Sequence, residues 1–82
     1  MPNTFLENQF VVAVLCPDAN FTHLLEEAQK NNFTVLEMIP FSKNVIDLST
    51  QSRGKPIFFV YGEGKSILAT SETEIASGLQ SC

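Results

Sequence analysis

Two cysteines, Cys16 and Cys82, are the residues of this chain whose chemistry could go beyond packing. A thiolate at either position can attack a disulfide or become part of one. Two cysteines are too few for the disulfide framework of a small secreted protein, and their wide spacing fits no zinc-binding pattern, so no metal site is expected. The chemistry to be weighed is therefore thiol chemistry, first of all at Cys16.

Cys16 lies where an apolar segment gives way to a polar one. Pro17 follows it, and proline is favoured at the first position of a helix because its missing amide would be unpaired there. A sulfur at the cap of such a helix faces free backbone amides and the positive end of the helix dipole, which stabilise a thiolate. Asp18 acts in the opposite direction because like charge disfavours the thiolate. The alternative interpretation is that Cys16 is a small apolar residue that ends a buried strand.

The elements that must position Cys16 are predicted from periodicity. Residues 9–15 are continuously apolar and rich in valine, which is typical of a central strand buried on both faces. Residues 33–39 predict a second strand, parallel to the first because a strand-helix-strand unit of this length makes a crossover. Between them, apolar side chains at helical spacing predict an amphipathic helix that ends near residues 31–32: Phe21, Leu24, Leu25 and Ala28.

The second half of the chain predicts a short helix, a hairpin and a terminal helix. Ser42 can cap the short helix, and Gly54 suits the left-handed position after its last turn. Residues 57–61 and 66–70 flank a glycine-containing turn and predict an antiparallel hairpin. A capping-box sequence at residues 71–74 begins the last helix. The expected element order is β-α-β-(α)-β-β-α, with a four-stranded mixed sheet.

The size and charge of the chain limit the classes of protein to which it can belong. With 82 residues and 44% hydrophobic content, it fits a single α/β domain over residues 1–82, in which residues 1–8 form a loose lead-in. The net charge of −4 argues against nucleic acid and anionic membranes as partners. No apolar run approaches the roughly 20 residues that cross a bilayer, so we expect a cytoplasmic protein. The oligomeric state stays open.

Cys16-Pro17 at a strand-to-helix junction and Lys55-Pro56 before an apolar strand resemble the glutaredoxin and thioredoxin family. In that family, a Cys-Pro-x-Cys motif starts the first helix, and a cis-proline precedes the third strand and faces the reactive sulfur. The resemblance therefore implies a thioredoxin-like fold in which Pro56 is cis and lies against Cys16. The alternative for Pro56 is a trans proline, because proline is tolerated at the first residue of any strand. The resemblance also implies that Cys16 is catalytic and that Pro17, Lys55 and Pro56 contact the substrate.

Ala19 stands where the family has its second cysteine, so the resemblance implies monothiol chemistry. Cys16 would then form a mixed disulfide with a protein partner or with glutathione, the one cofactor that the resemblance suggests. The alternative function is a redox-inactive thioredoxin-fold module that binds another protein, with Cys16 incidental. A phosphocysteine carrier is disfavoured because Pro17 lacks an amide and Asp18 repels phosphate.

The same topology places the remaining candidate residues. If the last strand returns toward Cys16, the final helix leads away from it by about 15 Å over ten residues. We therefore do not expect an intramolecular bridge between Cys16 and Cys82, and we expect Cys82 to be an exposed thiol able to cross-link two chains. The alternative is that Cys82 is a functional resolving cysteine. His23 falls on the polar side of its helix and is interpreted as a surface histidine rather than a catalytic base.

Overall fold

The structure is a computed structural model and describes residues 10–82. The predicted lead-in, residues 1–8, and Gln9 at the start of the predicted first strand lie outside the described residues. Seven elements follow one another in the expected order β-α-β-α-β-β-α, which confirms an α/β chain. They are β1 (Phe10–Leu15), α1 (Phe21–Asn31), β2 (Thr34–Met38), α2 (Val45–Ser52), β3 (Ile57–Tyr61), β4 (Lys65–Ala69) and α3 (Glu72–Ser81).

The four strands form one mixed sheet in the order β2-β1-β3-β4. β1 is parallel to both β2 and β3, whereas β3 and β4 form the predicted antiparallel hairpin. Val12 lies opposite Ile57, and Leu15 lies opposite Val60. The carboxyl ends of β1 and β3 therefore meet at the same edge of the sheet, next to Cys16.

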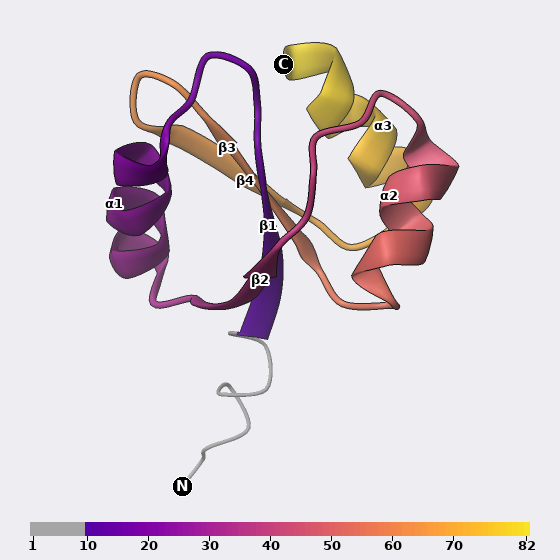
Figure 1. The fold of residues 1–82 in the computed structure, drawn as a ribbon, viewed down its shortest axis with the longest axis horizontal. Helices are drawn as coiled ribbons and strands as arrows, with labels where there is room; N and C mark the ends of the chain where they lie inside the picture. The colour runs from indigo at the N-terminus through magenta and orange to yellow at the C-terminus, as the bar shows by residue number, and fades with distance from the viewer. Residues whose placement is uncertain (1–9) are drawn as a thin grey trace, which may run out of the picture.

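Helices cover both faces of the sheet: α1 lies on one face, and α2 and α3 lie on the other (Figure 1). The side chains of β1 and β3 alternate between the two faces, and β3 is buried at every position, as a central strand should be. One core cluster lies under α1 and contains Val11, Ala13, Leu24, Ala28, Phe58 and Val60. The other lies under α2 and α3 and contains Val12, Val14, Cys16, Leu48, Phe59 and Ile75 among its members.

The first helix begins later than the sequence suggested. Asn20 is its N-cap: the Asn20 side chain accepts from the His23 amide at 3.0 Å, and His23 Nδ1 accepts from the Asn20 amide at 3.0 Å. The expectation that Cys16 caps this helix with Pro17 at its first position is therefore wrong. A reciprocal Asn-His cap satisfies two amides that a Cys16 cap could not. The helix ends as predicted, with Asn32 left-handed at φ 59°.

The second helix confirms the prediction of a short helix but differs from it at both ends. Asn44 rather than Ser42 is its N-cap and accepts from the Asp47 amide at 3.1 Å. Ser42 instead accepts from the Asn44 amide at 3.1 Å, so it supports the residue that caps. At the other end the left-handed residue after the last turn is Arg53, followed by Gly54, which also has a positive φ.

None of the helices within residues 10–82 is long and apolar enough to cross a bilayer.

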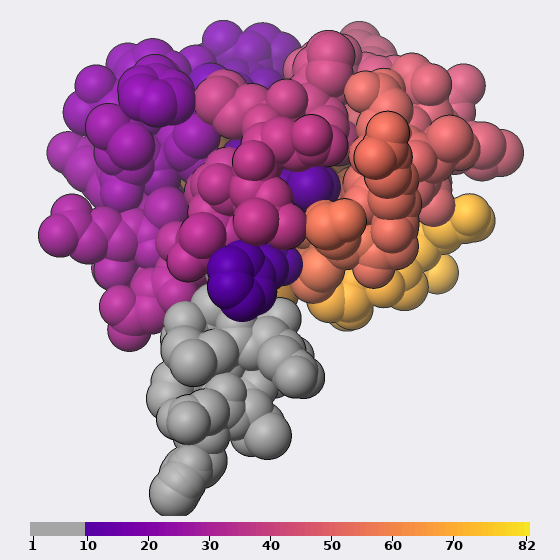
Figure 2. Space-filling view, turned by 60° about the horizontal axis from the view of Figure 1, so that its bottom comes forward, coloured from indigo at the N-terminus to yellow at the C-terminus, as the bar shows by residue number. Residues whose placement is uncertain are grey.

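The direction of β3 overturns the prediction for Pro56. A proline at the start of one strand faces the end of its neighbour only if the two strands are antiparallel, and β3 is parallel to β1. The Pro56 carbonyl accepts from the Val12 amide at 3.0 Å, far along β1 from Cys16. Figure 2 brings this edge forward, with the orange segment that leads into β3 beside the indigo start of β1. No peptide bond within residues 10–82 is cis, so Pro56 is trans.

The same strand direction overturns the prediction for Cys82. Because β3 ends at the Cys16 edge, β4 runs away from that edge, and α3 then leads back toward it (Figure 1). Cys82 forms a disulfide with Cys16, 66 residues earlier in the chain, with a Cα–Cα distance of 5.4 Å. That distance lies within the usual range for a disulfide. The expectation of separate thiols failed because it assumed that the last strand returned toward Cys16.

Candidate functional site

Cys16 is held at the carboxyl end of β1. Its amide donates to the Val60 carbonyl at 3.0 Å, and its carbonyl accepts from the Ala19 amide at 2.9 Å. The bond from Ala19 closes a turn through Pro17, and the bond to Val60 joins Cys16 to β3. Cys16 is only 1% exposed. The Cys16 side chain therefore lies in the core, on the face of the sheet that α2 and α3 cover.

Cys82 reaches Cys16 because α3 packs unusually close to β3. A Cβ added at Gly78 would lie 2.7 Å from Cδ2 of Phe59, closer than packed carbons approach, so this contact requires glycine. The buried Tyr61 hydroxyl donates to the Gly78 carbonyl at 2.9 Å and ties the end of β3 to the helix. Burial raises the pKa of Tyr61, and a smaller opposite effect comes from a hydrogen bond with Ser81. Cys82 lies one turn beyond Gly78, on the same side of the helix.

The two residues of the disulfide differ in their exposure. Cys16 is buried, whereas Cys82, the C-cap residue of α3, is exposed. Cys82 also lines a cavity at the surface, whereas Cys16 does not, so Cys82 is the residue of the pair that is more open to an outside thiol. Neither cysteine has a free thiol, because the two sulfurs are joined in the disulfide. Exchange at this site must begin with an attacking thiolate from a partner.

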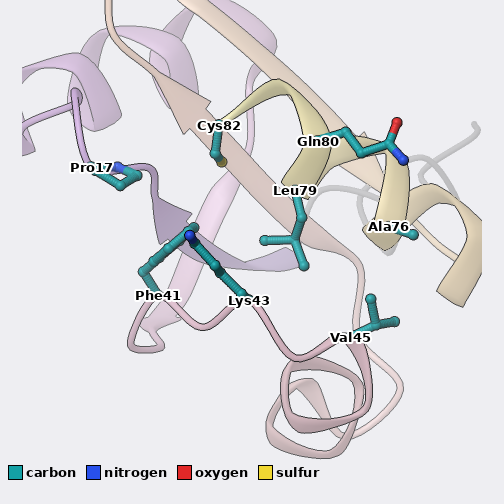
Figure 3. Close-up of a pocket in the computed structure, with 8 residues that line it drawn as sticks. All are labelled: Pro17, Phe41, Lys43, Val45, Ala76, Leu79, Gln80 and Cys82. Atoms are coloured by element: carbon teal, nitrogen blue, oxygen red, sulfur yellow. The ribbon is translucent and has the colours of Figure 1, made fainter.

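A cavity of about 500 Å³ opens beside Cys82. Three segments wall it: the turn after β1, the loop and first turn of α2, and the last turns of α3 (Figure 3). Most of its lining is apolar, and Lys43 is its single charged side chain. The lining residues are Pro17, Phe41, Lys43, Val45, Ala76, Leu79, Gln80 and Cys82.

The predicted site residues fall into two groups. Cys16 and Pro17 lie at the disulfide and the cavity, as expected for residues after β1. Lys55 and Pro56 precede β3 and therefore lie at the opposite edge of the sheet, away from Cys16. His23 is half-buried and serves as a helix-cap acceptor; it does not line the cavity.

Sequence reasoning missed Phe41 and Lys43, which line the cavity. Both lie just after β2, and the carboxyl ends of parallel strands meet at one edge of a sheet. That rule, applied to the residues after 33–39, could have placed them near Cys16. Phenylalanine and lysine do not indicate a site by their residue type, so only their position after β2 could have placed them there.

A second cavity, of about 700 Å³, lies by the β3–β4 turn and has a polar lining that includes Glu27. Glu27 is only 3% exposed; its Oε2 accepts from Lys30 Nζ at 3.0 Å and its Oε1 accepts from Ser66 Oγ at 2.8 Å. Burial alone would raise the pKa of Glu27, but the hydrogen bonds from Ser66 and Lys30 and the charge of Lys30 together lower it. This carboxylate is thus occupied in joining α1 to β4.

Within residues 10–82, no group of three or more His, Cys, Asp or Glu side chains gathers closely enough to hold a metal ion. No protein-family model matches the chain, and comparisons with curated proteins and with solved structures also find no match. The geometry around Cys16 and Cys82 is therefore the basis for inferring a function.

Proposed function

We propose that this protein performs thiol-disulfide exchange through the pair Cys16–Cys82, with Cys82 as the sulfur that a partner thiol attacks. The observation that carries the proposal is that the only two cysteines of the chain, 66 residues apart, are joined at the edge where β1 and β3 end. The proposal keeps the redox role that the sequence suggested for Cys16. It replaces the monothiol scheme, because Cys82 supplies the second sulfur that Ala19 cannot.

The exchange has two balanced steps. A partner thiolate attacks Sγ of Cys82, the bond to Cys16 breaks, and the electron pair leaves with Sγ of Cys16, which takes a proton from water. A second partner thiolate then attacks the partner's sulfur in the mixed disulfide, the bond to Sγ of Cys82 breaks, and Sγ of Cys82 leaves with the electron pair and takes a proton from water, which releases the oxidised partner. Two partner thiols are thereby oxidised to one disulfide, and Cys16 and Cys82 are reduced to thiols. The partner is a small thiol such as glutathione, or a protein cysteine.

Because Cys16 is buried, the partner thiol attacks Cys82, and the rate of disulfide exchange is low. A leaving sulfur departs more slowly when its thiolate is poorly stabilised, and Cys16 leaves into the core. We therefore expect exchange to be slower than at a site with an activated thiolate. In a reducing cytoplasm, where we expect the protein, intracellular disulfides are usually transient, which favours a redox role over a permanent cross-link.

A thioredoxin-like fold belongs to the same proposal. The element order and the mixed four-stranded sheet support it, whereas the parallel direction of β3 relative to β1 does not. The part of the resemblance that assigned substrate contacts to Lys55 and Pro56 loses its basis, because these residues lie at the other edge of the sheet. Pro17, which borders the cavity beside Cys82, keeps its proposed role in contacting a partner.

The second candidate function is a redox-inactive binding module, and the apolar cavity favours it. In that case the disulfide would only pin the last turn of α3 to the sheet. The two functions differ in whether the native protein exchanges its disulfide.

Trapping the mixed disulfide separates these functions. The Cys16→Ser variant, incubated with oxidised glutathione, should carry one glutathione on Cys82, as identified by peptide mass spectrometry, and should release it to reduced glutathione. The matched Cys82→Ser variant should react far more slowly because Cys16 is buried. A wild-type disulfide that resists reduced glutathione until the protein is unfolded would instead assign it a structural role.

A further inference from the structure

The cavity beside Cys82 combines an apolar wall with a single cation. We infer that it is a binding site for a small amphipathic anion, a carboxylate with a short apolar body, whose charge is met by Lys43. This inference goes beyond thiol-disulfide exchange and does not require it, because it concerns the oxidised protein with its disulfide intact.

The walls of the cavity suit the apolar part of such a ligand. Its volume of about 500 Å³ is in the usual range for small-molecule sites. Phe41, Val45 and Leu79 line it and are also packed against the core cluster under α2 and α3, so the wall is fixed by the fold rather than formed on binding. In Figure 3, Leu79 and Cys82 on α3 face Phe41 and Lys43 across the cavity.

Charge selects an anion as the polar part. Lys43 has the only charged side chain of the lining, in a protein whose net charge is −4. Among residues 10–82 the one ion pair joins Lys30 to Glu27, so Lys43 has no carboxylate partner within the described part of the chain. Lys43 is exposed, so its ammonium group can meet a carboxylate at the mouth of the cavity, where one such ion pair contributes at most about 1 kcal/mol.

Binding is tested with octanoate as the probe and octan-1-ol as its uncharged counterpart. The oxidised protein, labelled with ¹⁵N, is titrated with each, and amide shifts are followed by NMR. Octanoate should cause saturable shifts centred on Lys43, Val45, Ala76 and Leu79, and should bind about fivefold more tightly than octan-1-ol, as expected for one ion pair.

Two variants assign the site. Lys43→Gln should weaken octanoate binding about fivefold, whereas Lys55→Gln, the same change of charge at the opposite edge of the sheet, should leave it unchanged. Ala76→Leu should abolish binding because the larger side chain fills the cavity from a half-buried helical position. Equal binding of octan-1-ol, unchanged binding by Lys43→Gln, or shifts centred elsewhere would each overturn the inference. Glutathione exchange is measured on the same samples without octanoate, so failure of the two proposals can be told apart.

Discussion

Glu27 is a buried carboxylate that stays ionised because Ser66 and Lys30 hydrogen-bond to it. Its pKa in the folded protein lies below the ordinary 4.5. Its contribution to stability is therefore fully present above the unfolded pKa and is lost as the pH falls through the lower, folded pKa. Between neutral pH and about pH 4.5 this contribution should hold, and it should fade in more acidic solution.

The Glu27→Gln variant measures this contribution. At pH 7 we expect it to lower the free energy of unfolding by roughly 1 to 2 kcal/mol, since hydrogen bonds to a charged group are lost or weakened. Urea unfolding at a series of pH values should show that the difference in free energy of unfolding between wild type and variant becomes smaller below pH 4.5. Glu74, whose pKa is also lowered by hydrogen bonds from Thr70, is common to both proteins and cancels in the comparison. If the difference in free energy of unfolding did not depend on pH, Glu27 would not be ionised in the folded protein.

At the scale of elements, the approach of α3 to β3 sets the position of Cys82. Gly78→Ala tests it, because two effects of known size oppose each other. Alanine raises helix propensity by up to about 1 kcal/mol, but a methyl group 2.7 Å from Phe59 overpacks the contact at a cost of roughly 1 to 3 kcal/mol. We expect the overpacking to prevail and the thermal midpoint of the oxidised protein to fall.

Ser77→Ala is the matched control, since it makes alanine at the neighbouring, exposed position of α3. It should leave the midpoint nearly unchanged or raise it slightly. If Gly78→Ala behaved like Ser77→Ala, the close contact with Phe59 would not exist in solution.

Most elements were predictable from the sequence because each depends on local periodicity. The direction of β3 was not obtained in this way, because an apolar run such as residues 57–61 does not indicate whether the strand is parallel or antiparallel to its neighbour. The rule that made β1 and β2 parallel also applies to β2, α2 and β3, because α2 carries the chain back across the sheet. The resemblance at Pro56 implied that β3 runs antiparallel to β1. The prediction followed the resemblance and did not apply this rule.

The candidate site was predictable only in part, for a related reason. Cys16 and Pro17 are chemically distinctive and follow a recognisable strand. Phe41 and Lys43 are ordinary residues of a loop, and only the three-dimensional packing of that loop against α3 makes them neighbours of Cys82. Cys82 itself could not be placed without the direction of β3.

At the scale of the whole molecule, the disulfide closes a loop that spans almost the entire described chain, with a separation of 66 residues. Loop-closure entropy alone predicts a stabilisation of about 4 kcal/mol for a loop of that length. Denaturant unfolding of the oxidised and reduced forms should differ by roughly 2 to 4 kcal/mol. Cys82→Ser should match the reduced wild type and should not respond to reductant; equal stability of the two wild-type forms would show that the bond is absent or leaves the unfolded chain unconstrained.

The most direct test of the account is a redox titration of the native wild-type protein in glutathione buffers, with thiols quenched by alkylation and mapped by mass spectrometry. We predict that Cys16 and Cys82 change redox state together in one reversible two-electron transition, with any glutathione adduct confined to Cys82. Two thiols that titrate independently, or a dimer linked through Cys82 while Cys16 stays reduced, would contradict it.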